Sequence, residues 1–268
     1  MHSKQKFKFE VPYAIKLMED IKNGIDTKEK LKESTGIGEN KIVTYLEWLK
    51  YINGIKIDNR IISLTKLGET YIEIKYSDDL VEPLMFYHLL RDPSLPENDG
   101  HLYFSAIIND VLFENVFSYE NTLSTNDIKK SLSKMEINDS EFIIAAINTL
   151  ADSELGFGKM GILEPEEGEN KNQKYEIHSY WVEPLVAAYI LYDIWEENQG
   201  SMDIEKIISS KYNLGRFFLM DEEAIMETLE EIQNLKLISI EKIAGLNQIR
   251  INPEIKKDDI LDMIIKMS

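Results

Sequence analysis

The sequence has no cysteine, and this absence excludes disulfide bonds and metal sites built on thiolates. It also has no apolar run near the roughly 20 residues that a membrane-spanning helix needs. The N-terminal residues MHSKQKFKFE lack the apolar core of a secretory signal peptide. We therefore expect a cytoplasmic protein that does not contact a membrane. Its 268 residues, 43% of them hydrophobic, suffice for one large domain or for two to three small ones.

Basic residues are scarce outside the N-terminal quarter. The formal net charge is −18, which on average repels a phosphate backbone. Residues 1–75 hold 14 lysines and arginines against 11 acids, whereas 76–199 hold 7 against 24 and 200–268 hold 9 against 13. Any contact with DNA should therefore be made by the N-terminal quarter, and the acidic middle should not lie on nucleic acid.

The opening segment has the order of helices and strands that is typical of a winged helix. VPYAIKLMEDIKNG and TKEKLKEST predict two helices, the second capped by Thr27. A third helix is predicted over 39–52, and the β-rich runs GIKI and RIISL follow it. Asp58-Asn59 between these runs tolerates the dihedral angles of a tight hairpin. The core face of the third helix, at the spacing i, i+4, i+7, consists of Ile42, Leu46 and Leu49.

The same order returns twice. LYFSAIINDVLFENVF, TNDIKKSLSK and NDSEFIIAAINTLADSELG predict three helices, with Thr125 as the cap of the second, before GILEP and KYEIH. PLVAAYILYDIWEEN, SMDIEKIISSKY and DEEAIMETLEEIQN predict three more, with Ser201 at the start of the second and Asp221 as the cap of the last. KLISI then pairs with NQIRI across AGL. The predicted fold is mainly α with small β-hairpins, built from three tandem winged-helix-like units with intervening helices.

We place the domain boundaries by these repeats and by charge. The predicted domains are an N-terminal winged helix at 1–75, an acidic helical middle with a second winged-helix-like unit at 76–180, and a C-terminal winged helix at 181–268. Two further helices are predicted to begin with the same four residues, at 81–84 and 182–185, both VEPL. Proline suits a first helical turn because its missing N–H would be unpaired there anyway. Coincidence explains this short match as well as duplication does.

Two motifs resemble those of enzymes, but the surrounding sequence does not favour catalysis. Residues 156–161, GFGKMG, fit G-x-G-x-x-G. A dinucleotide site needs a strand before this motif and a helix after it, whereas here a helix precedes and a strand follows. A turn that ends a helix explains the glycines better. Glu73-Ile74-Lys75 has the E-x-K spacing of many metal-dependent nucleases, but alternating charge after a wing is the simpler explanation.

Histidine also provides no recognisable site. The four histidines show no metal-ligand spacing, and His88, between Tyr87 and Leu89, is predicted to pack half-buried on a helix. The sequence contains no P-loop, and no Ser-His-Asp arrangement can be recognised from it. We therefore predict no catalytic residues, no metal site, no cofactor, and a protein that is not an enzyme.

Opposite its core face, the predicted helix over 39–52 carries side chains suited to recognition. Asn40, Lys41 and Thr44 suit base edges and phosphates, although lysine-rich helices are often only solvated. Trp48 and Tyr51 are large aromatic residues of the kind that another surface covers, so we predict that they bind a partner protein. Backbone contacts are predicted for Lys28, Lys30, Lys32, Lys4, Lys6 and Lys8, and a minor-groove contact for Arg60.

Three segments together resemble an uncharacterised bacterial and archaeal family that is known only as a domain of unknown function. They are GIGENKIVTYLEWLKYINGI, then SLTKLGETYIE followed by DDLVEPLMFYHLL, and finally NLGRFFLMDEEAIMETLEEI with IAGLNQIRI. Its members tend to lie in defence islands beside sulfurtransferase and ATPase genes related to DNA phosphorothioation. The most specific parts are 215–218 (GRFF) and 244–246 (AGL), whereas about 115–178 matches weakly. The resemblance implies a DNA-modification or anti-phage setting with such partners, and it brings no catalytic residues.

Arg216 lies in the most specific of these segments. An arginine between a glycine turn and an apolar run can bind a phosphate or an acidic side chain of a partner, so it is a candidate partner-binding residue. In so acidic a chain, an internal ion pair is the favoured alternative.

Two functions of different classes remain open. The one we favour is a non-enzymatic DNA-binding or adaptor subunit of a DNA phosphorothioation-type modification or anti-phage defence system. Its N-terminal unit would meet double-stranded DNA, and its acidic remainder would meet sulfurtransferase or ATPase partners. The alternative is an acidic tandem winged-helix scaffold that binds only proteins, as in condensin-like complexes. A nuclease that depends on Glu73 and Lys75 is the weakest hypothesis.

Overall fold

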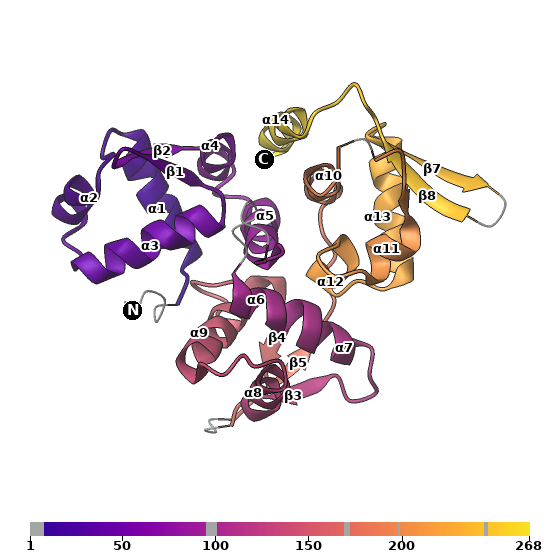
Figure 1. The fold of residues 1–268 in the computed structure, drawn as a ribbon, viewed down its shortest axis with the longest axis horizontal. Coiled ribbons are helices and arrows are strands. Elements are labelled where there is room, and N and C mark those ends of the chain that lie inside the picture. Colours follow the sequence, from indigo (N-terminus) through magenta and orange to yellow (C-terminus); the bar gives the residue numbers. More distant parts are fainter. Residues whose placement is uncertain (1–7, 95–100, 169–171, 198, 244–245) are drawn as a thin grey trace.

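The computed structural model describes residues 8–94, 101–168, 172–197, 199–243 and 246–268. In these ranges the chain is mainly helical with small antiparallel sheets, as the sequence predicts. Three units, each with its own hairpin or sheet, meet near one central helix, α5 (Asp78–Leu90) (Figure 1). Across the described part of the chain, no helix has the length and apolar character needed to cross a membrane.

The first unit consists of three helices and a two-stranded hairpin. Thr27 caps α2 as predicted, because its hydroxyl accepts a hydrogen bond from the N–H of Lys30 at 3.3 Å. The N–H of Ile62 donates to the carbonyl of Asp26 at 2.7 Å, so one backbone bond ties the hairpin to the segment before α2. The elements are α1 (Val11–Lys22), α2 (Lys28–Thr35), α3 (Glu39–Tyr51), β1 (Ile55–Asp58) and β2 (Ile61–Leu64).

Two helices lead from this hairpin to the centre of the molecule. They are α4 (Lys66–Glu73) and α5, in which every residue from Leu80 to Leu90 is buried. Burial all round is typical of a helix that protein encloses on every side. The prediction that this helix begins at Val81 is wrong. It begins at Asp78, and Pro83 lies inside it, where the ring cannot donate to the carbonyl four residues earlier.

The middle unit has a three-stranded sheet in the order β3-β5-β4. Ser124, and not the predicted Thr125, caps α8. Its hydroxyl accepts from the N–H of Asp127 at 3.2 Å, and the Asp127 carboxylate accepts from the N–H of Ser124 at 3.0 Å, which completes a capping box. The elements are α6 (Leu102–Ala106), a π-helix (Ile107–Leu112), α7 (Phe113–Val116), β3 (Thr122–Ser124), α8 (Thr125–Ser133), α9 (Ser140–Ala151), a 3-10 turn (Gly158–Met160), β4 (Leu163–Pro165) and β5 (Lys174–Ile177).

The third unit repeats this order with the sheet β6-β8-β7. Pro184 lies in the first turn of α10, and Asp221 caps α13 by accepting from the N–H of Ala224 at 2.9 Å, both as predicted. The prediction that α10 begins at Val182 is wrong, because the helix begins at Pro184. The helix predicted from Ser201 begins later, because two residues first form a strand. Residues 244–245 of the predicted AGL turn lie outside the described residues. The elements are α10 (Pro184–Asp193), β6 (Met202–Asp203), α11 (Ile204–Ser209), α12 (Leu214–Phe218), α13 (Glu222–Asn234), β7 (Ile238–Ile243), β8 (Leu246–Ile251) and α14 (Lys257–Met267).

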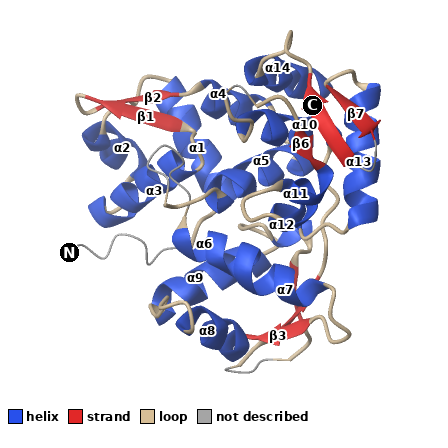
Figure 2. Ribbon diagram, turned by 45° about the vertical axis from the view of Figure 1, so that its right-hand side comes forward, coloured by secondary structure: helices blue, strands red, loops and turns tan. Residues whose placement is uncertain are grey.

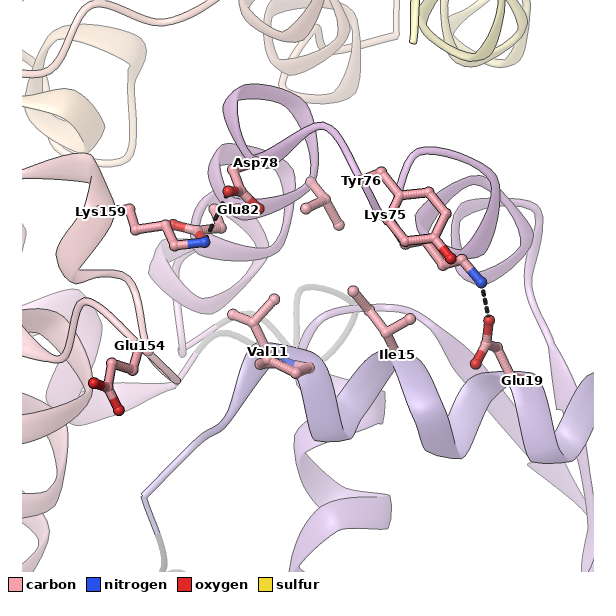
Figure 3. Close-up of a pocket in the computed structure, with 12 residues that line it drawn as sticks. Val11, Ile15, Glu19, Lys75, Tyr76, Asp78, Glu82, Glu154 and Lys159 are labelled. Atoms are coloured by element: carbon pink, nitrogen blue, oxygen red, sulfur yellow. Dashed lines mark hydrogen bonds and ion pairs between the residues drawn. The ribbon is translucent and has the colours of Figure 1, made fainter.

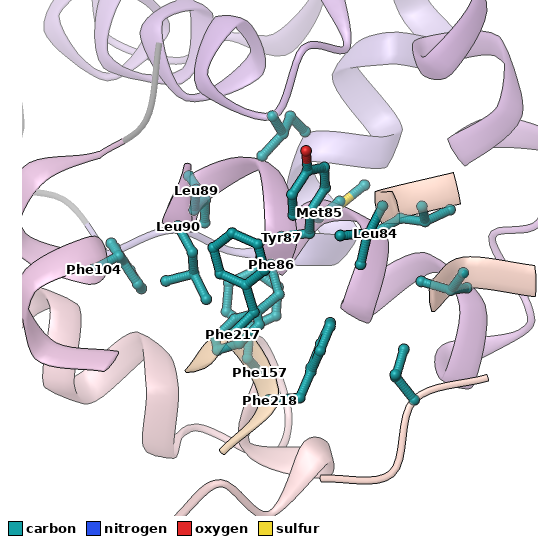
Figure 4. Close-up of a cluster of buried hydrophobic side chains, with 14 of the residues drawn as sticks. Leu84, Met85, Phe86, Tyr87, Leu89, Leu90, Phe104, Phe157, Phe217 and Phe218 are labelled. Atoms are coloured by element: carbon teal, nitrogen blue, oxygen red, sulfur yellow. The ribbon is translucent and has the colours of Figure 1, made fainter. Parts of the chain in front are cut away.

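Aromatic side chains around α5 join the three units (Figure 4). Phe86 of α5 lies 5.3 Å from Phe157 of the middle unit and 6.0 Å from Phe218 of the third, measured between ring centroids. Tyr87 lies 5.2 Å from Phe217. These rings are all buried. The units therefore share one hydrophobic core, and their relative placement is fixed by packing.

The last helix returns to the first unit. α14 packs against both α10 and α4, and Figure 2 shows it beside α4. Lys66 of α4 forms an ion pair with Asp262 of α14. The C-terminal helix α14 is thus held against α4, which directly follows the hairpin of the first unit.

Candidate nucleic-acid and partner interface

α3 occupies the position at which a winged helix carries its recognition helix, but most of its surface is enclosed. The predicted core face is buried, at Ile42, Leu46 and Leu49. Only Glu39 and Asn40, in the first turn, are exposed. A recognition helix reads bases by laying one whole face along the major groove. α3 has no exposed face of that length, because only its first turn is exposed.

Thr44 does not face solvent, so its predicted placement on an exposed face is wrong. Its residue is 2% exposed, and its hydroxyl donates to the carbonyl of Asn40 at 2.9 Å. A helical repeat marks one apolar face, whereas α3 has a second buried face made partly of polar and aromatic residues. Thr44 is thus placed to stabilise α3 and not to reach a base edge.

Trp48 and Tyr51 are covered by the same chain, which corrects their prediction as partner-binding residues. Trp48 is 2% exposed and stacks on His101 of the middle unit, with ring centroids 4.7 Å apart and planes at 23°. Its edge contact with Phe104 of α6 spans 5.9 Å. Tyr51 is half-buried and meets His101 edge-on at 5.2 Å. These aromatic residues hold the first unit against the middle one.

His101 is an aromatic packing residue in this interface. Burial lowers the pKa of its imidazole to about 3, because a charged ring would lose its hydration. The ring is therefore neutral at physiological pH and can stack on an indole without a desolvated charge. His88 of α5 is likewise buried, with Nε2 3.2 Å from the Tyr189 hydroxyl. Its predicted packing role is confirmed, with complete burial in place of half-burial.

The three lysines of α2 that are predicted to contact DNA already have acidic partners. The Nζ of Lys30 lies 2.8 Å from Oδ1 of Asp26. The Nζ of Lys28 lies 2.7 Å from Oε1 of Glu39, and that of Lys32 lies 3.7 Å from Oε2. The hydrogen bond from Lys28 lowers the pKa of the Glu39 carboxyl. The side chains of these pairs are substantially exposed, so the pairs contribute little to stability. A phosphate would still have to compete with Glu39 for Lys28 and Lys32.

Lys41 and Asn40 lie at the same end of α3. Asn40 is exposed, and Lys41 is half-buried. The Lys41 Nζ lies 5.0 Å from the ring centre of Tyr13 and 5.7 Å from that of Tyr45, a cation–π geometry. The predicted DNA contacts of Asn40 and Lys41 stay predictions, and both residues are placed at the surface as such contacts require.

The hairpin of the first unit projects a second basic group. Asn59 and Arg60 form its turn with φ of 49° and 69°, so the turn lies one residue later than predicted and Asp58 is in the strand. Arg60 and Lys56 are both exposed. Neither forms an ion pair with any residue that the structure describes, which distinguishes them from Lys28 and Lys32.

Arg216 is engaged within the chain, so its predicted availability to a partner is wrong and the internal pairing is confirmed. Its Nε donates to the carbonyl of Ser209 at 2.6 Å, and Nη1 donates to the carbonyl of Asn109 at 2.6 Å and to Glu114 at 3.0 Å. The guanidinium also lies 4.3 Å from the ring centre of Phe113. Arg216 thereby ties the third unit to the π-helix and α7 of the middle unit.

The E-x-K motif does not lie on a strand as it does in the nucleases it resembles. Glu73 ends α4 and pairs with Lys22 of α1 at 2.8 Å, and Lys75 pairs with Glu19 of the same helix. Both pairs link α4 and its following turn to α1. Across the described ranges, no group of three or more histidine or acidic side chains could hold a metal ion.

The glycines of the G-x-G-x-x-G motif form a turn after α9, as predicted. The N–H of Gly156 donates to the carbonyl of Asp152 at 3.1 Å, and the N–H of Phe157 donates to that of Thr149 at 2.9 Å. Asp152 also pairs with Lys8, one of the N-terminal lysines predicted to contact DNA. Lys4 and Lys6 lie outside the described residues.

One charged surface was not predicted as a site. α13 has the recognition-helix position in the third unit, yet its solvent face is acidic, and α13 differs from α3 in presenting that face freely. Its acids form no ion pair with the residues described. The only sequence signal is the acidic run DEEAIMETLEE itself. The exposed acids are Glu222, Glu223, Glu227, Glu230 and Glu231.

Comparison with solved structures identifies proteins that share this fold. A magnesium ion-bound SspB crystal structure superposes with a TM-score of 0.74 at 13% sequence identity, over 99% of this chain and 88% of that chain. A second SspB crystal structure gives 0.72 and 12% with the same coverage. At this sequence identity, the similarity to the SspB structures shows a shared fold. The search of curated protein sequences found no match. The family model described as "Protein of unknown function (DUF4007)" matches residues 13–265, so the chain belongs to that family.

Proposed function

We propose that the protein is a non-enzymatic adaptor subunit of a DNA phosphorothioation-type modification or anti-phage defence system. The setting rests on the family resemblance of its sequence, and the fold it shares with SspB supports a related role. The observation that carries the adaptor role is the enclosure of α3: the helix that would read DNA in a winged helix instead holds two units together. The remaining exposed surface divides into a basic tip and an acidic body.

The basic tip meets double-stranded DNA in this proposal. It consists of α2, the exposed end of α3 and the neighbouring hairpin. Such contacts go to phosphates and position the chain, whereas base readout would need a helix face that α3 does not offer. Arg60 and Lys56 are the strongest contributors because neither forms an ion pair with a residue that the structure describes. The full set is Lys28, Lys32, Asn40, Lys41, Lys56 and Arg60.

The acidic body holds partner proteins in this proposal. The solvent face of α13 presents a row of carboxylates that a basic protein surface complements. A sulfurtransferase or an ATPase of the same system is the partner that the family resemblance implies. Because charge complementarity mainly accelerates association, this contact should weaken as salt rises.

A scaffold that binds only proteins is the second candidate. The pairing of Lys28 and Lys32 with Glu39 favours it, since it removes two cations from a DNA surface that is already small. The two candidates share the protein-binding body and differ only in the use of the basic tip.

Duplex binding by variants of the tip separates these candidates. We expect the double variant Lys56→Ala, Arg60→Ala to bind duplex DNA about three- to tenfold more weakly than the wild type at low salt. The matched control is Lys206→Ala, which removes an exposed lysine from the third unit. Equal affinity of the double variant and the wild type would contradict the DNA contact and leave the protein-only scaffold.

Plasmid nicking tests the non-enzymatic part of the proposal. We expect supercoiled plasmid to stay intact when it is incubated with the protein and millimolar Mg²⁺. Nicking that increases with protein concentration and disappears in Glu73→Gln would overturn this part, because it would restore the nuclease hypothesis.

A further inference from the structure

A pocket of about 290 Å³ opens where α1, the start of α5 and the turn after α9 meet (Figure 3). It therefore lies at a junction of the first unit, the central helix and the middle unit. One part of its lining is apolar and comes from α1 and α5. These residues are Val11, Pro12, Ile15 and Val81.

Glu82 of α5 lines this pocket although it is only 4% exposed. Its carboxylate forms no hydrogen bond or ion pair with the residues described. An ionised carboxylate that is buried without a partner is costly, and this burial raises the pKa of Glu82 to about 7. Such a group lacks a counter-ion, and the pocket gives it access to one from outside the chain.

The other charged groups of the pocket are already paired or lie at the rim. Asp78 accepts from Lys159 at 2.8 Å, and Glu19 pairs with Lys75. Glu154 is exposed. In Figure 3 the Lys159 amine reaches toward the Asp78 carboxylate, beside Glu82. The lining thus has four carboxylates against two lysines, and both lysines are engaged.

Three ligand classes fit this lining poorly. An anion meets a net negative charge. A neutral apolar molecule leaves the Glu82 carboxylate desolvated. A magnesium ion demands several oxygen ligands in near-octahedral geometry, and Glu82 alone is unpaired while Asp78 and Glu19 are bound to lysines.

We propose that this pocket binds an alkylammonium group, with the Glu82 carboxylate as its counter-ion and the alkyl chain against Val11, Ile15 and Val81. An ammonium donates charge-assisted hydrogen bonds to a carboxylate, and its aliphatic stem suits an apolar wall. Two sources supply this chemistry: the lysine side chain of a partner protein and a free aliphatic amine. The site does not depend on the proposed adaptor role, since it would exist whether or not the chain binds DNA.

Calorimetric titration of the full chain with n-pentylamine tests the site. We expect Glu82→Gln to reduce the affinity at least tenfold, whereas Glu154→Gln, which removes a carboxylate at the rim, should change it less than twofold. 1-Pentanol, which has the same chain without the charge, should bind at least tenfold more weakly than the amine. Equal binding of pentylamine to the wild type and Glu82→Gln, or equal binding of the alcohol and the amine, would overturn the proposal.

The pH dependence of the wild type provides a test that needs no variant. Affinity should increase from about pH 6 to about pH 8 as Glu82 loses its proton. The charged groups that act on it are Asp78 and Asp79 of α5 and Lys159 from the turn after α9, and the titratable group of Tyr180 also interacts with it. Affinity that is constant or falls over this interval would contradict the assignment to Glu82.

Two further titrations separate the sources and exclude a metal site. A lysine capped at both backbone ends should bind at least as tightly as pentylamine if the natural occupant is a partner's side chain. If only the free amine binds, the occupant is a small amine, and the proposal stands in either case. Displacement of pentylamine by stoichiometric MgCl₂ would overturn it in favour of a cation site.

Discussion

At the scale of single residues, Trp48 and Glu82 show how burial changes the meaning of a side chain. The sequence placed Trp48 on a recognition face, yet its contacts with His101 and Phe104 make it part of the core between two units. In the sequence, Glu82 is only the residue before the proline of the segment VEPL. In the structure it is a buried carboxylate that lines a pocket. Helical periodicity in a sequence indicates the one apolar face of a helix that is buried. Neither the ring contacts of Trp48 nor the pocket contact of Glu82 lies on such a face.

Removal of the Trp48 ring should destabilise the fold. We expect Trp48→Ala to lower the free energy of unfolding by about 3–5 kcal/mol, because the indole fills space between two units that cannot collapse freely. Urea denaturation measures this change. The matched control is Trp181→Ala, whose ring is 47% exposed and should cost about 1 kcal/mol or less. If Trp48→Ala unfolds like the wild type, the ring does not hold the two units together.

Glu82 should make stability depend on pH. Its folded pKa of about 7 exceeds the ordinary value of 4.5, so the protonated group favours the folded state. That contribution is complete below about pH 4.5 and is lost as pH rises through about 7. Glu82→Gln should therefore match the wild type near about pH 4 and be more stable by roughly 3 kcal/mol near about pH 9. Urea midpoints at several pH values test this, and a gain that does not vary with pH would refute it.

At the scale of elements, local signals were predictable and contacts between units were not. Thr27 and Asp221 cap their helices where the sequence indicated. The cap of α8 is Ser124, one residue before the predicted Thr125, because a capping box with Asp127 is more favourable than a single threonine cap. α5 begins at Asp78 and not at the predicted Val81, because Pro83 lies inside the helix and not in its first turn.

Arg216 should stabilise the contact between the third unit and the middle unit. We expect Arg216→Ala to lower the free energy of unfolding by about 1–3 kcal/mol, because the carbonyl of the buried residue Asn109 loses its donor, whereas the exposed Ser209 carbonyl can bond to water. Arg216→Lys should recover only part of this, since one ammonium does not reproduce the planar fork of a guanidinium. Chemical denaturation of both variants measures the effect. Full stability of Arg216→Ala would return Arg216 to the predicted role at a partner surface.

At the scale of the whole molecule, the division of charge along the sequence survives in the fold. Several basic residues of the N-terminal quarter, among them Lys32, Lys56 and Arg60, are exposed on α2 and the hairpin, whereas the third unit presents an acidic α13. Fold class and charge layout could be predicted because both follow from local pattern and composition. The packing of three units around α5 could not, because it depends on side chains such as Phe86, Phe157 and Phe218 that are far apart in sequence.

The salt dependence of duplex binding by the wild-type protein tests the central claim most directly, namely that a small basic tip is the only surface that meets DNA. Four cations at the tip, the half-buried Lys28 and the exposed Lys32, Lys56 and Arg60, predict that log K falls with log salt at a slope of about −4. The slope should be the same with and without phosphorothioate linkages, since the linkage keeps the phosphate charge. No binding even at about 50 mM salt, or a slope steeper than about −8, would contradict the account. The first result would leave a scaffold that binds only proteins, and the second would require DNA contacts beyond the first unit.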